Sequence, residues 1–195
     1  MVEEISQIDR LTGEERSQLL LLARQAIEKA VNGEDYLLPD LDCLSPRLRA
    51  DGVCFVTLTR PDGELRGCIG GLEAVRPLAL DVCDHAVAAA MEDYRFLPVR
   101  PEEVAGLRIE ISRLTPTRPL VYDRPEDLPG LLHPDDGVVL RDGARRATFL
   151  PQVWEKLPDP SDFLNHLCQK MGLPPGQWRR RKMQVEIYHV EEFHE

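Results

Sequence analysis

The chain has 195 residues, of which 43% are hydrophobic and 30% are charged, as in an ordinary soluble globular protein with one sizeable domain. Its formal net charge is −10 at pH 7. Nonspecific binding to nucleic acid or to an anionic membrane needs a basic surface and is therefore not expected, and the short basic run at 179–182 is most simply a solvated segment.

The cysteines and histidines do not form a metal-binding or disulfide pattern. The five cysteines are Cys43, Cys54, Cys68, Cys83 and Cys168. Their odd number and wide spacing indicate neither a disulfide framework nor a zinc knuckle. The histidines show no HxH or HExxH spacing, so no metal and no cofactor are expected. No secretory signal or membrane span is visible, and a reducing cytoplasm is the expected compartment.

The first predicted element is an amphipathic helix. Thr12 and Glu15 have the spacing of a capping box, apolar residues recur with a helical period between Leu19 and Ala30, and Asn32 is followed by a glycine that ends the pattern. Residues 34–50 contain two prolines and are expected to be a connecting segment.

A hairpin and a second helix are predicted next. Apolar and β-branched residues favour strands at about 53–59 and 64–70, joined by a turn. Helical spacing then predicts a helix over 75–91, whose alanine-rich end suits close packing on a sheet. Cys83 lies on the apolar stripe of this helix and is expected to be buried and inert, while His85 lies beside the stripe and has a packing or surface role.

The second half of the chain alternates between strands and irregular segments. Clean alternation predicts a strand over 107–114, and four prolines between 116 and 129 indicate a loop-rich lobe. A second hairpin is expected over 137–150, a helix over about 160–171 and a last strand over 185–191. Because the helices separate hairpins rather than single strands, the predicted class is α+β, with helices covering a largely antiparallel sheet.

The stretch Leu65–Gly71 holds one cysteine among three glycines. If 64–70 is extended, Arg66 and Cys68 share a face of the strand, and a nearby guanidinium favours thiolate over thiol. A structural interpretation remains open. In it, the glycines permit tight packing, Arg66 ties two strands together through Glu110, and Cys68 fills a small space.

Several motifs in this order resemble one known family. The hexapeptide at 65–70 is similar to the signature of the AMMECR domain, also called the A component of AmmeMemoRadiSam systems. Residues 93–96 resemble the family's Asp-x-Arg-Phe motif, although the second position, often proline, is tyrosine here. Further similar segments lie at 52–58, 110–112, 150–153 and 163–173, so that the resemblance covers about 50–193.

The resemblance implies a fold and a set of partners. The whole chain, 1–195, is expected to form a single AMMECR-like domain with a larger α+β lobe, a smaller loop-rich lobe and a cleft between them. It also implies a pathway or complex shared with a Memo-type protein and a radical S-adenosylmethionine protein. It names no reaction, and the radical enzyme's cofactor is not transferred, because the chain has no three-cysteine cluster for an iron–sulfur centre.

The leading hypothesis is an enzyme that uses Cys68 as nucleophile in the cleft, on a small molecule or a modified protein, with Glu110 orienting the substrate or moving a proton. Asp93 and Arg95 form either a salt-bridged helix terminus or an anion-binding wall of the same cleft. The alternative is a binding module that accepts a small molecule, a peptide or the Memo-type partner without chemistry. The candidate substrate-binding residues are Arg66, Gly67, Gly70, Asp93, Arg95, Ser112 and Gln152.

Overall fold

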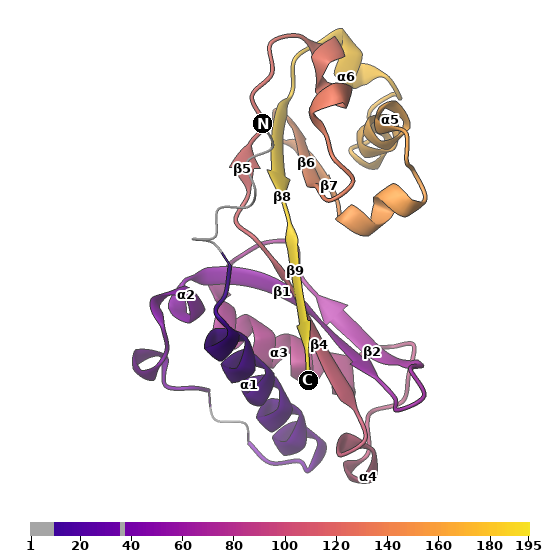
Figure 1. Cartoon of the computed structure of the whole chain (residues 1–195). Helices are drawn as coiled ribbons and strands as arrows, with labels where there is room; N and C mark the ends of the chain where they lie inside the picture. Colours follow the sequence, from indigo (N-terminus) through magenta and orange to yellow (C-terminus); the bar gives the residue numbers. More distant parts are fainter. Residues whose placement is uncertain (1–9, 36–37) are drawn as a thin grey trace. The chain divides into compact units, whose positions relative to one another are not determined.

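The computed structural model describes residues 10–35 and 38–195. The chain divides into two compact units, which are coloured along the sequence in Figure 1. Unit 1 comprises the residues up to Leu114 together with Glu191–Glu195, and unit 2 comprises Thr115–Val190. Each unit has its own apolar core. The secondary structure is α+β with antiparallel sheets, as predicted, whereas the cleft expected between two lobes stays a prediction.

Unit 1 consists of one antiparallel sheet and of helices that pack on it. Its helical segments are α1 (Gly13–Val31), η2 (Leu41–Cys43), α2 (Pro46–Arg49), α3 (Leu78–Met91) and α4 (Pro101–Val104). Its strands are β1 (Asp51–Thr59), β2 (Leu65–Gly70), β3 (Arg76–Pro77), β4 (Arg108–Leu114) and β9 (Val190–His194), of which the first residue, Val190, belongs to unit 2. The strands lie in the order β2-β1-β4-β9, and β3 pairs with the first residues of β1.

The alternation of side chains along β1 explains how this sheet is packed. Cys54, Val56 and Leu58 are fully buried, whereas Phe55 and Thr57 between them are half-buried. The buried residues belong to the core that α1 and α3 form against the sheet, and Figure 1 shows these two helices side by side. The sheet therefore has one face covered by helices and one face that the helices of unit 1 leave open.

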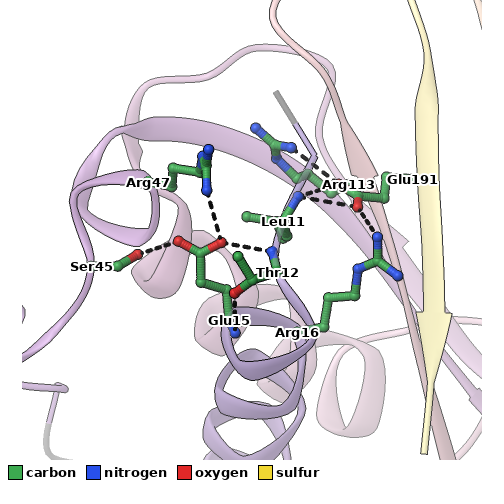
Figure 2. Close-up of polar contacts among 8 residues, drawn as sticks. All are labelled: Leu11, Thr12, Glu15, Arg16, Ser45, Arg47, Arg113 and Glu191. Carbon is green, nitrogen blue, oxygen red and sulfur yellow. Dashed lines mark hydrogen bonds and ion pairs between the residues drawn. The ribbon is translucent and has the colours of Figure 1, made fainter. Parts of the chain in front are cut away.

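The start of α1 follows the predicted capping box and is anchored by two carboxylates (Figure 2). Glu15 accepts the backbone N–H of Thr12 and the hydroxyl of Ser45. Burial alone would raise the pKa of Glu15, but these bonds and the charge of Arg47 outweigh burial and lower it. The cluster fixes the helix against the segment that the sequence indicated only as a connection.

The second carboxylate of Figure 2 joins the last strand to the rest of unit 1. Glu191 accepts bonds from the guanidinium groups of Arg16 and Arg113, at 2.5 and 3.1 Å, and from the backbone N–H of Leu11. Its side chain is 11% exposed. One residue of β9 is thus bound to both α1 and β4.

Unit 2 holds a second antiparallel sheet and a second core. Its strands, in the order β5-β8-β6-β7, are β5 (Arg118–Pro119), β6 (Gly137–Asp142), β7 (Arg145–Phe149) and β8 (Gln184–Tyr188). Its helices are η3 (Pro125–Leu131), η4 (Pro151–Glu155), α5 (Pro160–Lys170) and α6 (Gln177–Arg180). In the core, Trp154 stacks on Phe163 with ring centroids 3.8 Å apart.

The strand predicted over 185–191 is divided in the structure. It ends at Tyr188, and β9 begins at Val190 in the other sheet. His189 between them exchanges bonds with Thr115: its carbonyl accepts the backbone N–H of Thr115, and its own N–H donates to the Thr115 hydroxyl. The pairing partner of the chain changes at this residue, and strand residues lie directly on both sides of it, which is why the sequence pattern looks continuous. Across the described residues, no helix is long and apolar enough to cross a membrane.

Candidate active site

The candidate site is a row of side chains across three strands of unit 1. Cys68 on β2 lies opposite Thr57 on β1, and Thr57 lies opposite Glu110 on β4. Directly opposed residues of antiparallel strands point to the same face. Because this register places the three on the face opposite that of Cys54 and Val56, they lie on the open face of the sheet.

A second row on the same face lies beside the first. Gly70 is opposite Phe55, and Phe55 is opposite Ser112. A Cβ atom at Gly70 would lie 2.3 Å from the ring of Phe55, so the absence of a side chain at position 70 lets the ring lie over the strand. The ring gives the open face an apolar wall next to Cys68. The face thus combines a thiol, a hydroxyl, a carboxylate and an aromatic surface.

The thiol of Cys68 is half-buried and bonded to a hydroxyl. The Thr57 hydroxyl donates to the sulfur at a distance of 3.3 Å. The backbone of Cys68 is held just as firmly: its N–H donates to the Asp93 carboxylate at 2.9 Å, and its carbonyl accepts from Arg95 at 3.1 Å. The position of the sulfur is therefore fixed by both side-chain and backbone bonds.

Asp93 and Arg95 form a tight ion pair on the turn that follows α3. Two nitrogens of the guanidinium donate to the carboxylate, at 2.9 and 2.6 Å. The bonds from Arg95 lower the pKa of Asp93 against the effect of burial, and the bonds to Asp93 raise the pKa of Arg95, with a further contribution from the nearby Cys68. Asp93 is buried and Arg95 is 43% exposed at its side chain. The pair as a whole is neutral, and both its carboxylate and its guanidinium are bonded to the backbone of Cys68.

Arg66 has a different environment from the one that strand alternation predicts. The register of β2 shifts between Leu58 and Thr59, so that Gly67 faces Leu58, Leu65 faces Thr59, and Arg66 is the extra residue of a bulge. Its guanidinium is buried and binds Glu103 through two bonds, at 2.9 and 3.1 Å. The expected tie between Arg66 and Glu110 is absent from the contacts of the described residues, and the charge near the thiol comes from Arg95.

Gly67 serves the packing of β2 on α3. A Cβ atom there would lie 2.1 Å from the carbonyl oxygen of Ala89, which belongs to the helix backbone and cannot move away. The close approach of helix and strand thus depends on a glycine at this position. Gly67 lies on the helix side of the sheet and does not line the open face.

The remaining candidates divide between the two units. Ser112 is buried at the edge of the open face, in the row of Phe55. Gln152 is an exposed residue of η4 in unit 2, whereas the other candidates belong to unit 1.

Two residues that contribute contacts to the site, Thr57 and Glu103, were not predicted. Thr57 carried a usable signal, because it is a polar residue on the strand paired with the cysteine strand, but nothing in the sequence pointed to Glu103.

One cluster has the composition of a metal site, and it lies outside the row of Cys68. Among the described residues, the histidine, cysteine and acidic side chains close enough together to hold a metal ion are those of Cys54, Asp81 and His85. Cys54 and Asp81 are buried and His85 is half-buried. Sequence spacing gave no sign of this group, since Cys54 is on β1 and the other two are on α3.

The family follows from the comparison with known sequences. A family model described as AMMECR1 matches residues 20–193. The chain belongs to the AMMECR1 family. The resemblance expected from the hexapeptide is thereby confirmed.

The AMMECR1 relatives match nearly the whole chain. A protein of Methanothermobacter thermautotrophicus is 39% identical over 188 residues, which cover 95% of this chain and 96% of that protein. Protein MK0488 of Methanopyrus kandleri is 37% identical over 191 residues, with 96% and 91% covered. The crystal structure of the uncharacterized protein PH0010 of Pyrococcus horikoshii is similar to this AMMECR1 chain, with a TM-score of 0.71, 34% identity and coverage of 95% and 93%.

Proposed function

We propose that this AMMECR1-family protein is an enzyme in which the thiolate of Cys68 attacks an electrophilic carbon of a small molecule or of a modified protein. The observation that carries the proposal is the setting of the sulfur on the open sheet face. It accepts a bond from the Thr57 hydroxyl and lies near the guanidinium of Arg95. The nucleophile in such a reaction is the thiolate, and the Thr57 hydroxyl is a hydrogen-bond donor to the sulfur while the carbon is attacked.

The role of Glu110 follows from the spacing of the strands. One strand, β1, lies between the backbones of Cys68 and Glu110, so two strand spacings separate them, which amounts to about 10 Å at the usual distance between neighbouring strands. The carboxylate therefore does not deprotonate the thiol directly. A substrate bound between them, against the ring of Phe55, would have its reacting carbon over Cys68 and a polar group at Glu110, which orients that group or exchanges a proton with it.

The chemistry suited to this site is addition to a carbonyl or imine carbon. The thiolate forms a carbon–sulfur bond, and the electron pair of the carbon–oxygen or carbon–nitrogen double bond moves to its heteroatom, which takes a proton from water or Glu110. The Arg95 guanidinium offers charge stabilisation for an anionic group of the substrate.

We further propose that the reaction belongs to a pathway with a Memo-type protein and a radical S-adenosylmethionine protein. The family resemblance alone supports this part of the proposal.

The thiol itself can be tested before any substrate is known. Native protein would be alkylated with iodoacetamide near neutral pH, and the rate at each cysteine would be followed by peptide mass spectrometry. Cys43 is a suitable internal control, because it is exposed but its bond to Asp40 and the surrounding carboxylates raise the pKa of its thiol. We expect half-buried Cys68 to react at least about 10-fold faster than exposed Cys43.

Two further results would separate activation from mere access. Arg95→Gln should slow alkylation of Cys68 by about 3- to 10-fold and leave Cys43 unchanged, since only one positive charge near one thiol is removed. Alkylation of Cys43 ahead of Cys68 would overturn the proposal. With an activated thiol established, a metabolite mixture would be screened for a mass increase on the Cys68 peptide, with Cys68→Ala as the blank.

A binding module is the second candidate function, and one observation favours it. Tyr94 and Leu97, on either side of the Arg95–Phe96 pair, are 93% and 78% exposed. Exposed apolar side chains gathered in a short segment suit contact with a protein or peptide. Under this alternative, Tyr94→Ser and Leu97→Ser would abolish binding to the Memo-type partner, while Cys68→Ala would bind that partner as wild type does and cause no loss of function.

A further inference from the structure

The cluster of Cys54, Asp81 and His85 in unit 1 joins the sheet to its covering helix. Asp81 and His85 are one turn apart on α3, and Cys54 is on the neighbouring strand β1. The Asp81 carboxylate accepts the backbone N–H of Cys54 at 2.9 Å and lies 3.1 Å from Nδ1 of His85. The sulfur of Cys54 lies 3.9 Å from the same nitrogen.

We propose that Cys54, Asp81 and His85 form a binding site for a divalent transition metal ion, with Zn²⁺ as the best match. The set supplies a thiolate, an imidazole and a carboxylate, which are the three ligand types that zinc takes in proteins. Magnesium and calcium prefer an all-oxygen set and do not suit a sulfur ligand. The proposal concerns residues other than those proposed for catalysis and does not rest on that function.

The distances between the candidate ligand atoms are close to those of a tetrahedral site. Zinc bond lengths of about 2.0 to 2.3 Å place the ligand atoms of a tetrahedron about 3.3 to 3.6 Å apart. The sulfur, the imidazole nitrogen and a carboxylate oxygen already lie within 4.8 Å of one another. Small side-chain rotations therefore suffice to close the site around an ion.

Charge gives an independent argument. The Asp81 side chain is 5% exposed, and its hydrogen-bond and ion-pair partners among the described residues are Cys54 and His85, neither of which carries a permanent positive charge. A buried carboxylate is normally paired with a cation. A divalent ion would balance the carboxylate and the thiolate together.

Metal binding would change the protonation of the cluster in a defined way. The ion replaces the thiol proton of Cys54, which leaves to solvent, and binds Nδ1 of His85, whose ring then carries its proton on Nε2. A Cβ atom at Gly71 would lie 3.5 and 3.8 Å from Cε1 and Nε2 of this ring, so the edge opposite the metal faces the end of the glycine motif. The His85 side chain is 19% exposed, which leaves room for water as a fourth ligand.

The test is a cobalt titration of the full chain. Reduced protein, freed of metal by a chelator, would be titrated with Co²⁺, which takes the same sites as Zn²⁺ and gives a thiolate-to-metal charge-transfer band in the near ultraviolet. We expect one Co²⁺ per chain, with the band lost when Zn²⁺ is added. His85→Gln should weaken Co²⁺ binding by about 100-fold or more. Loss of a residue that only orients a metal ligand weakens binding by at most about 100-fold, so a larger effect indicates a ligand.

Two variants keep the experiment decisive. Cys54→Ser should remove the charge-transfer band, and Cys68→Ser should retain it, which separates this site from the proposed catalytic cysteine. If Cys54→Ser does not fold, His85→Gln serves instead, because His85 is only half-buried. Zn²⁺ should raise the melting temperature of wild type but not that of His85→Gln. Absence of the charge-transfer band in wild type, or an unchanged band in His85→Gln, would overturn the proposal and leave an imidazolium–carboxylate pair as the role of the cluster.

Discussion

The carboxylate of Asp93 accepts the backbone N–H of Cys68 at a distance of 2.9 Å. Arg95, which is bound to Asp93, donates to the carbonyl of the same cysteine at 3.1 Å. Because β2 lies at the edge of its sheet, these backbone groups have no neighbouring strand on the outer side. The side chains of Asp93 and Arg95 thus bond the backbone of Cys68 as a neighbouring strand would. These bonds connect the Asp-x-Arg motif to the cysteine motif.

Replacing Asp93 with asparagine tests that relationship. The amide keeps one acceptor oxygen but loses the charge that holds Arg95, so we expect the free energy of unfolding to fall by about 2 kcal/mol. We also expect slower alkylation of Cys68, since the backbone and the guanidinium are no longer fixed. Urea unfolding and peptide mass spectrometry measure the two effects.

Asp127→Asn is the matched control for this change. Asp127 also binds an arginine, Arg124, but on the surface of η3, where the arginine side chain is 72% exposed. Exposed ion pairs contribute little, so the loss of stability should be much smaller than for Asp93→Asn. Equal losses for Asp93→Asn and Asp127→Asn would contradict a special role for Asp93.

Gly67 gives a second prediction. In Gly67→Ala the new methyl group would lie 2.1 Å from the carbonyl oxygen of Ala89, and strand and helix must separate to relieve the overlap. We expect a loss of about 3 kcal/mol or more in the free energy of unfolding, measured by urea denaturation. Gly13→Ala, at a position with nothing within 4 Å, should change stability by less than about 0.5 kcal/mol. A tolerated Gly67→Ala would mean that the motif glycine has no packing role.

Local patterns in the sequence predicted most of the elements, because each depends on neighbouring residues. The capping box at Thr12 is present as expected, and so is the start of α5 after Asp159. The alternation along β4 holds from Arg108 to Ile111, but the three residues that follow are all buried. The bulge at Arg66 was not predicted. It leaves Arg66 without an opposing residue on β1, and no turn residue or break in the sequence pattern marks it. The division of the last strand at His189 was missed for a similar reason: extended chain continues on both sides.

The candidate site was only partly predictable, because its contacts join distant segments. The sequence singled out Cys68, Glu110 and Arg95, but it assigned the charge beside the thiol to Arg66 two residues away. Because of the bulge, the guanidinium of Arg66 binds Glu103. Arg95, which follows Cys68 by 27 residues, bonds to the cysteine instead. The group of Cys54, Asp81 and His85 depends in the same way on how α3 packs on β1, which spacing alone does not show.

The pair of Arg66 and Glu103 predicts a dependence of stability on pH. The bonds from Arg66 and from the backbone N–H of Arg100 lower the pKa of Glu103 to about 2, from an ordinary value of 4.5. A carboxyl group whose pKa is lower in the folded state stabilises the protein fully above its unfolded pKa and loses that effect as pH falls. The contribution, about 2 kcal/mol after allowance for partial exposure, should therefore disappear between about pH 4.5 and pH 2.

Arg66→Met measures this contribution directly. The variant removes the charge but retains an apolar chain in the buried position, so it should be about 2 kcal/mol less stable than wild type at neutral pH. Its loss of stability on acidification should be smaller than that of wild type, as followed by urea unfolding between neutral pH and the acid range. Arg76→Gln, which breaks an exposed pair with Asp84, should leave the pH dependence unchanged. Parallel pH profiles for Arg66→Met and wild type would contradict the assignment.

Glu191 offers the last prediction, because it fixes the final strand to unit 1 through three donors (Figure 2). In Glu191→Gln the neutral amide no longer balances Arg16 and Arg113, and Arg113 is buried, so we expect a loss of about 3 kcal/mol. Hydrogen exchange should also become faster at the amides of β9, since the strand is bound less firmly. Glu192→Gln, at the next and exposed position of the same strand, should change neither quantity. If both variants behave alike, general charge and not the Glu191 contacts stabilises the strand.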